Sequence, residues 1–320
     1  MTPFQGKLRI RHLEIMLVVA ELGNLSKAAE QLDMTQSGLS RAIVDMEECV
    51  GGQLFERTPR GTKPTMLGRV LCTHANRLLG DFRKAQTDLA AVLRGDLGSL
   101  TVGCFSMFSG WPLPQAARRF RDQSPRVALS IEIGGAERLL EDLDAGALDM
   151  VVGRSPAGPN PQIYRTLALL NDPPVLACAR QHVLAEQPSV ALADCIAYPW
   201  VTALPGSRFR LELERRLADL GCEMPPMIGA LSIEFGRELI ANRDYVWMLP
   251  GSVAQVMQAR GEVHVLPVAL DLRESPLSII WRRDRSSTRH VRAFAAILAQ
   301  IVRETGPRGT WTKGGLESES

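Results

Sequence analysis

Hydrophobic residues in the first fifty positions recur at intervals of three and four, which is the spacing of the buried face of a helix. The pattern predicts one helix over residues 8–22 and a second over 27–32, for which Ser26 is the expected cap. A third helix is expected to begin after Thr35 and to reach about Glu48. Only two residues separate the second helix from the third, so the chain must turn tightly between them.

The third predicted helix is amphipathic. Leu39, Ile43 and Met46 share its inner face. Two helices joined by a tight turn are typical of a helix-turn-helix unit, whose second helix enters the major groove of DNA. The N-terminal turns carry short polar groups and one arginine on the outer face: Thr35, Gln36, Ser37, Ser40 and Arg41. Such groups can bond to base edges and phosphates. The alternative is a three-helix bundle whose exposed face is simply polar.

The next stretch, GGQLFERTPRGTKPTMLG, combines an apolar anchor with cations around turn residues. We expect a short hairpin with Arg57, Arg60 and Lys63 near its tip, a wing that can contact phosphates or the minor groove. An ordinary solvated loop is the alternative interpretation.

Residues 67–94 contain no proline and carry apolar positions alternately four and three residues apart, an a/d heptad pattern. The positions are Leu71, Ala75, Leu78, Phe82, Ala85, Leu89 and Val92. A narrow apolar stripe on so long a helix indicates a dimer seam. Residues 95–98, Gly-Asp-Leu-Gly, predict a hinge after it.

After Ser99 short apolar runs alternate with helical patterns, which predicts parallel sheets covered by helices. Several candidate ligand residues follow predicted strands or open predicted helices: Ser106, Gly135, Thr202, Gly206, Ser207 and Arg208. Free backbone N–H groups at helix starts favour an anionic ligand. Alternatively, Ser207 is only a helix cap and Arg208 a solvated surface residue.

The N-terminal segment resembles the LysR-type transcriptional regulators over about sixty contiguous residues. The matching motif residues are Ala28-Ala29-Glu30-Gln31-Leu32, Thr35-Gln36-Ser37, Leu39-Ser40-Arg41, Ile43, Glu47, Leu54-Phe55-Glu56-Arg57, Arg60-Gly61, Thr65 and Gly68. The stretch NRDYVWMLP resembles the corresponding segment of a subgroup that regulates protocatechuate and sugar-uptake genes.

The resemblance implies an α+β multidomain protein with a winged helix-turn-helix, a long linker helix and a two-lobed α/β domain similar to periplasmic binding proteins. The expected boundaries are 1–66 for the DNA-binding domain, 67–94 for the dimerisation helix, 95–98 for the hinge, 99–304 for the effector-binding domain and 305–320 for a flexible tail. Lobe one is expected to comprise 99–167 and 274–304, and lobe two 168–273. By resemblance, Ser106, Gly135, Thr202 and Ser207 fall near positions that line effector pockets.

The resemblance further implies a homo-oligomer, a dimer of dimers, that binds double-stranded promoter or operator DNA. It implies activation of a neighbouring operon and repression of the protein's own gene, with RNA polymerase as a further partner. The expected effector is a carboxylate or a sugar derivative, and no cofactor or metal is expected.

Composition narrows the alternatives. The chain carries none of the motifs GxSxG, HExxH or GxxxxGK[ST], so an enzyme is not expected. No run approaches 20 apolar residues and no signal peptide is evident, which predicts a cytoplasmic protein without membrane spans and disfavours a solute-binding protein. Net charge is only +2. The six scattered cysteines indicate reduced thiols, although a redox sensor using Cys178, Cys195 or Cys222 stays open.

Overall fold

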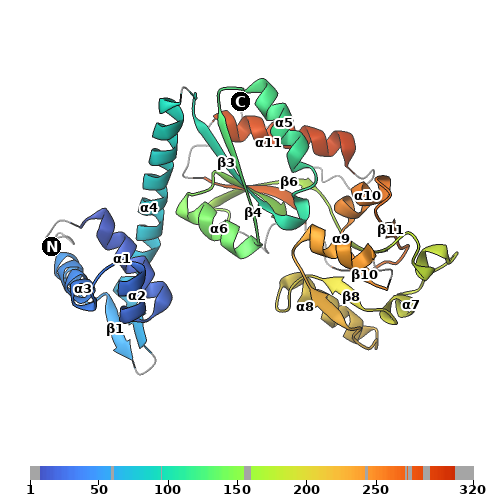
Figure 1. Ribbon diagram of the computed structural model, residues 1–320, viewed down its shortest axis with the longest axis horizontal. Coiled ribbons are helices and arrows are strands. Elements are labelled where there is room, and N and C mark those ends of the chain that lie inside the picture. Colours follow the sequence, from blue (N-terminus) through green and yellow to red (C-terminus); the bar gives the residue numbers. More distant parts are fainter. Residues whose placement is uncertain are drawn as a thin grey trace. The chain divides into compact units, whose positions relative to one another are not determined.

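The computed structural model describes residues 8–58, 61–94, 96–154, 160–241, 244–270, 272, 276–283 and 289–306, without the side chains of Arg57, Thr58 and Arg208. The chain divides into two compact units: residues 1–94 with 144–147, and residues 95–143 with 148–320. Each unit has a hydrophobic core of its own. Figure 1 shows the helices and strands of both units. The predicted tail lies outside the described residues from position 307 onward.

The N-terminal unit is a helical head with a two-stranded hairpin. Its elements are α1 (Ile10–Leu22), α2 (Leu25–Gln31), α3 (Gln36–Val50), β1 (Phe55–Thr58), β2 (Gly61–Pro64) and α4 (Met66–Leu93). Thr35 caps α3 as predicted, because its Oγ1 accepts the N–H of Gly38 at 3.1 Å. The prediction that Ser26 caps α2 is wrong. Asn24 is the cap: its Oδ1 accepts the N–H groups of Ser26 and Lys27, each at 3.0 Å, so the helix starts earlier.

The hairpin is held against the turn between α1 and α2. Thr62 donates its N–H to the carbonyl of Gly23 at 2.7 Å. A Cβ atom added at Gly61 would lie 2.4 Å from the same carbonyl oxygen, and Gly61 has φ +118°. Both the contact and the backbone conformation therefore require glycine at position 61.

The side chain of one threonine makes two hydrogen bonds at the start of helix α4. Thr65 Oγ1 accepts the N–H of Gly68 at 3.0 Å and donates to the carbonyl of Gln53 at 2.7 Å. A Cβ atom on Gly68 would approach the carbonyl oxygen of Leu54 to 2.1 Å. The Thr–x–x–Gly spacing therefore fixes where the helix leaves the hairpin.

The predicted seam along α4 divides into two parts. Leu71 and Ala75 are buried in the core of the head, where they do not face outward. The other five positions are exposed in the single chain: Leu78, Phe82, Ala85, Leu89 and Val92. The unpartnered stripe is therefore shorter than the sequence pattern predicts.

Lobe one of the C-terminal unit is a five-stranded mixed sheet in the order β4-β3-β5-β12-β6. Its strands are β3 (Ser99–Phe105), β4 (Ala128–Gly134), β5 (Met150–Arg154), β6 (Tyr164–Leu170) and β12 (Leu277–Arg282). Its helices are η1 (Ser106–Phe108), α5 (Leu113–Gln123), α6 (Ala136–Ala145) and α11 (Arg289–Thr305). Helices α5 and α11 lie side by side over one face of the sheet, and α6 lies on the other (Figure 1).

Lobe two repeats this arrangement in the strand order β11-β7-β10-β8-β9. Its strands are β7 (Pro174–Cys178), β8 (Trp200–Thr202), β9 (Met227–Gly229), β10 (Val246–Pro250) and β11 (His264–Val265). Its helices are η2 (Val183–Glu186), α7 (Leu192–Ile196), α8 (Arg208–Asp219), α9 (Ile233–Ala241) and α10 (Gly251–Ala259). No described helix is long and apolar enough to cross a membrane.

The prediction of parallel sheets is only partly correct. Strands β3, β4 and β5 pair in parallel, as do β8, β9 and β10. Strand β7 pairs antiparallel with β10 and β11, and β12 pairs antiparallel with β5 and β6. The sequence passes from lobe one to lobe two between β6 and β7 and returns before β12, so β7 and β12 enter their sheets in the opposite direction.

Gly61→Ala should destabilise the N-terminal head by about 2–3 kcal/mol, because it adds a backbone clash to a left-handed conformation. Gly51→Ala is the matched control: Gly51 has φ +80° but nothing within 4 Å of an added Cβ atom, so its cost should be about 1 kcal/mol. Native-state hydrogen exchange of amides in α1 and α3 measures the stability of this unit separately. Equal losses in both variants would contradict the proposed contact.

Candidate DNA-binding face and effector cavity

The N-terminal turns of α3 present the side chains that the sequence pattern placed there. Leu39, Ile43 and Met46 are buried beneath the helix. Thr35, Gln36, Ser37 and Arg41 are exposed and Ser40 is half-buried. Among the described residues, the side chains of Gln36, Ser40 and Arg41 make no hydrogen bond. They are therefore available to an external partner.

The hairpin contributes one described cation to the same unit. Lys63 is exposed on β2, opposite Glu56 on β1. The side chain of Arg57 and the whole of Arg60 lie outside the described residues. The predicted basic wing is therefore represented in the described residues only by Lys63.

A cavity of about 280 Å³ lies between the two lobes of the C-terminal unit. Apolar and aromatic side chains from both lobes form most of its wall: Phe105, Met107, Phe108, Pro174, Phe209, Leu231, Trp247, Met248, Leu249 and Pro250. The size and lining are those of a small-ligand site with few polar groups.

Four of the six predicted ligand residues line this cavity: Ser106, Gly135, Thr202 and Ser207. Gly135 and Ala136 bring the N-terminus of α6 to the wall, where the first N–H groups of a helix have no partner within it. Gly206 is exposed, has φ +80° and does not line the cavity, so its role is to form the turn before α8. The side chain of Arg208 lies outside what the structure describes.

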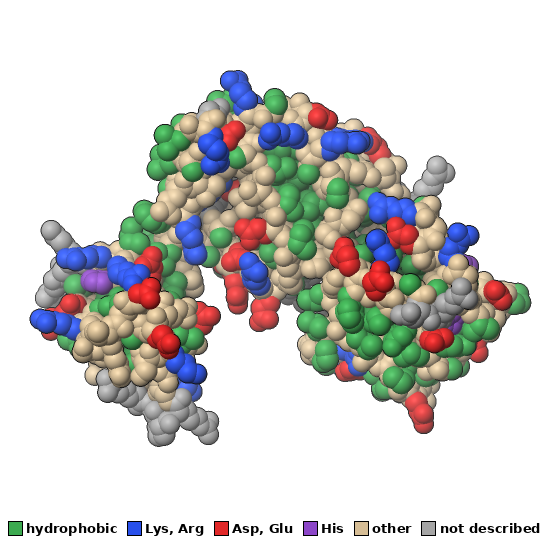
Figure 2. All heavy atoms as spheres, in the orientation of Figure 1, with side chains coloured by type: hydrophobic (Ala, Val, Ile, Leu, Met, Phe, Trp, Pro, Cys, Tyr) green, Lys and Arg blue, Asp and Glu red, His purple; other side chains and the backbone are tan. Residues whose placement is uncertain are grey.

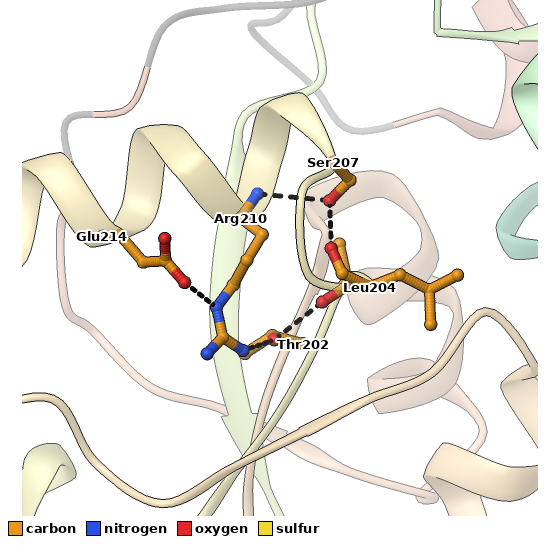
Figure 3. Close-up of polar contacts among 6 residues, drawn as sticks. Thr202, Leu204, Ser207, Arg210 and Glu214 are labelled. Atoms are coloured by element: carbon orange, nitrogen blue, oxygen red, sulfur yellow. Dashed lines mark hydrogen bonds and ion pairs between the residues drawn. The ribbon is translucent and has the colours of Figure 1, made fainter.

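The hydroxyl groups at the α8 end of the cavity are already engaged (Figure 3). Ser207 Oγ donates to the carbonyl of Leu204 at 2.7 Å and accepts the N–H of Arg210 at 3.4 Å, so Ser207 is a helix cap as well as a lining residue. Thr202 Oγ1 accepts from Arg210 Nη1 at 2.8 Å and lies 3.1 Å from the carbonyl of Ala203, to which it donates. Arg210 also donates from Nε to Glu214 at 2.6 Å.

The sequence analysis missed the charged residue of the cavity wall, Arg154. This side chain ends β5 and is only 8% exposed. Its Nη2 donates to the carbonyl of Asp172 and lies 3.5 Å from Oδ2 of the same residue. Its Cζ lies 4.4 Å from the centroid of the Phe209 ring. Burial lowers the pKa of Arg154, and the negative charge of Asp172 opposes that shift.

The described charged side chains on the visible face of the C-terminal unit form no patch of one sign (Figure 2). On the face shown in Figure 2, basic and acidic side chains are interspersed over the C-terminal unit. Within the cavity, the low dielectric strengthens the interactions of Arg154, the one charged side chain among the described lining residues.

The same division into head and two-lobed domain is found in known proteins. Residues 10–69 match the family described as "Bacterial regulatory helix-turn-helix protein, lysR family", and residues 93–303 match the LysR substrate binding domain. The chain belongs to the LysR family. It is a transcriptional regulator with a DNA-binding head and an effector-binding domain, as the motif residues of α2 and α3 indicated.

Curated relatives of this chain are transcriptional regulators. The regulator GbpR of Azospirillum brasilense is 26% identical over 298 residues, 92% of this chain and 86% of GbpR. PcaQ of Agrobacterium fabrum is 25% identical over 300 residues, 93% and 95% of the two chains. Both agree with the subgroup resemblance of NRDYVWMLP.

Solved structures of the family share the fold. CbnR, a LysR family transcriptional regulator, has a TM-score of 0.59 at 23% identity, covering 94% of this chain and 100% of CbnR. Full-length OxyR from Pseudomonas aeruginosa has a TM-score of 0.56 at 20% identity, covering 92% and 98%. A structure of CbnR with its target DNA also matches, with a TM-score of 0.58 at 23% identity, covering 93% and 100%.

Asp172→Asn should lower the free energy of unfolding of the C-terminal unit by about 3–5 kcal/mol, because it leaves the buried Arg154 cation without a counter-charge. Urea unfolding measures the change. Glu304→Gln is the control, since its ion pair with Arg119, at 2.6 Å, is exposed and should contribute far less. A loss at Asp172 no larger than that at Glu304 would show that the buried pair does not stabilise the unit.

Proposed function

We propose that this regulator reads operator DNA through the outer face of α3, assembles through α4, and responds to a small anionic metabolite bound between its lobes. The observation that carries the proposal is the pairing of two chemically different sites in one chain. One is the outer face of α3, where the side chains of Gln36, Ser40 and Arg41 make no hydrogen bond among the described residues. The other is an apolar cavity that contains a buried cation.

The DNA-reading part rests on residue chemistry. Arg41 can donate two hydrogen bonds to guanine, and Gln36 can pair with adenine in the major groove. Thr35, Ser37 and Ser40 are short enough to let the helix approach and can bond to phosphates. The wing cations Arg57, Arg60 and Lys63 would add contacts that depend little on base sequence.

The assembly part rests on the exposed stripe of α4. Leu78, Phe82 and Leu89 are 54%, 43% and 66% exposed, and Ala85 and Val92 continue the same a/d spacing. A row of exposed apolar side chains at this spacing is buried when two helices pair. We propose a homodimer through this stripe and a dimer of dimers on DNA, with RNA polymerase as a further partner.

A small-molecule sensor is favoured over a redox sensor that uses Cys178 and Cys195, whereas the third lobe-two cysteine, Cys222, is partly exposed. Cys178 and Cys195 are fully buried in the core around Trp200. Burial raises the pKa of Cys178 to about 12 and that of Cys195 to about 11. Oxidation by peroxide needs an accessible thiolate, and these two thiols are protonated at neutral pH and shielded from solvent.

Arg41→Ala and Gln36→Ala should each reduce affinity for the operator and relax its base preference, by roughly 1–3 kcal/mol where a bidentate contact is lost. Gln86→Ala, an exposed glutamine on α4, is the matched control and should bind normally. Footprinting against competitor DNA measures both effects. Unchanged discrimination in both α3 variants would remove the assignment of α3 as the recognition helix.

Phe82→Asp should abolish the dimer that forms through α4 and, with it, binding to paired half-sites, since a charge without a partner cannot be buried in the seam. Thr87→Asp places the same charge at an exposed polar position of the same helix and should leave the oligomer intact. Sedimentation velocity distinguishes the two. An unaltered oligomer in Phe82→Asp would contradict assembly through this stripe.

A further inference from the structure

Arg154 lies where three parts of the C-terminal unit meet. It is the last residue of β5 in lobe one, it bonds to Asp172 in the segment that crosses to lobe two, and its guanidinium lies over Phe209 of α8 in lobe two. It also lines the cavity between the lobes. A ligand that contacts Arg154 from the cavity therefore acts on all three parts.

The positive charge of Arg154 is incompletely compensated. The carboxylate of Asp172 directs its hydrogen bonds elsewhere: Oδ1 accepts the N–H of Ser252 at 2.8 Å, and Oδ2 accepts the Ser252 hydroxyl at 3.0 Å. Asp172 thereby accepts hydrogen bonds from the first turn of α10, where a negative charge is favourable. Arg154 keeps a 3.5 Å ion pair and one bond to a backbone carbonyl.

A guanidinium group has five N–H donors, and buried donors are almost always hydrogen-bonded. The Nε of Arg154 is buried and has no hydrogen-bond partner among the described residues. Burial also lowers the pKa of Arg154, because desolvation of the guanidinium outweighs the stabilisation of its charge by Asp172. The site therefore holds a buried donor without a partner beside a single, shared carboxylate.

The rest of the cavity is poorly suited to a neutral ligand rich in hydroxyl groups. Thr202 and Ser207 already donate to the carbonyls of Ala203 and Leu204. Ser106 Oγ lies 3.4 Å from the carbonyl of Gly134, its one hydrogen-bond acceptor among the described residues. A sugar placed against the aromatic wall would leave buried hydroxyl groups unpaired, which is costly. One cation beside an apolar wall instead matches one anionic group on an apolar body.

The N-terminus of α6 provides a second attraction for negative charge. Gly135 and Ala136 line the cavity, and the free N–H groups at the start of this ten-residue helix carry partial positive charge. A Cβ atom at Gly135 would meet Leu231 of lobe two at 3.6 Å, so the cleft is narrow at this end. Arg154 and the start of α6 are thus two electropositive groups in an otherwise apolar cavity.

We propose that the effector is a small monocarboxylate with an aromatic or aliphatic body, whose carboxylate binds the Arg154 guanidinium from the cavity while its body packs against Phe105, Phe209 and Trp247. This inference rests on the proposed function, because it specifies the ligand of the same cavity. Anion binding at Arg154 adds a charge-assisted contact at the junction of the lobes, so occupancy is coupled to how the lobes are held together.

The test compares acids with their neutral amides on the full-length chain. Benzoate, phenylacetate and hexanoate are titrated by calorimetry beside benzamide, phenylacetamide and hexanamide. At least one carboxylate should bind, and its amide should bind at least tenfold more weakly. Arg154→Gln should remove that preference, whereas Arg119→Gln, which removes an exposed arginine on α5 outside the cavity, should retain it.

A second variant distinguishes the loss of carboxylate binding from a loss of folding. Arg154→Met with Asp172→Asn removes both members of the buried pair, so no charge is left alone in the core. This double variant should remain folded by circular dichroism and should bind acid and amide alike. Persistent tenfold selectivity for the acid in the folded double variant would overturn the assignment of Arg154.

Other outcomes separate this inference from the proposed function. Binding of galactose or arabinose in the cavity, with no carboxylate of the panel bound, would overturn the monocarboxylate inference while the regulator still binds its operator. The absence of any binding by the three carboxylates would overturn it as well. Operator affinity is measured on the same wild-type sample, and its absence would contradict the proposed DNA reading independently of Arg154.

Discussion

A buried ion pair at the junction of two lobes is the constraint around which the C-terminal unit is arranged. A charge in a low-dielectric interior must have a counter-charge, and Arg154 and Asp172 supply each other with one. Asp172 also holds the start of α10 through Ser252. The positions of β5, of the segment that crosses to lobe two and of α10 therefore all depend on Arg154 and Asp172. Because Arg154 also touches Phe209, lobe two is included in that arrangement.

In the part that the structure describes, the N-terminal head is held together by apolar packing and close backbone contacts rather than by a buried ion pair. The proposed reading of DNA needs polar groups that are not satisfied inside the protein. On the outer face of α3, the side chains of Gln36, Ser40 and Arg41 make no hydrogen bond among the described residues. Leu39, Ile43 and Met46 hold the helix from below. Precise placement comes from close backbone contacts. Gly61 and Gly68 bring the hairpin and α4 against neighbouring carbonyl groups at distances that no side chain would allow.

Much of the head could be predicted from the sequence, because its determinants are local. The periodicity of α3, the cap at Thr35 and the Thr65–Gly68 spacing all act within a few residues. The cap of α2 was misassigned because Asn24 and Ser26 are both good capping residues, and only the backbone decides between them. Leu71 and Ala75 continue the heptad pattern, yet the head covers them, since spacing does not reveal which neighbour buries a residue.

The cavity was predicted less completely, because its chemistry depends on contacts far apart in the chain. Ser106, Gly135, Thr202 and Ser207 follow strands or open helices and could be found by topology. Arg154 also follows a strand, but nothing near it in the sequence shows that it is buried. Its hydrogen-bond partner, Asp172, lies 18 residues away in the sequence. The aromatic ring that its guanidinium contacts, Phe209, belongs to the other lobe.

The Nε–H resonance of Arg154 tests the central claim most directly. This donor is buried without a partner among the described residues, so a carboxylate bound at the guanidinium should change its ¹⁵N and ¹H shifts and slow its exchange with solvent. The signal is assigned by its loss in Arg154→Lys. The account predicts a saturable shift with an acid that calorimetry shows to bind, and none with its amide. A bound carboxylate that leaves the resonance unchanged would show that Arg154 is a structural ion-pair partner and not the ligand's anchor.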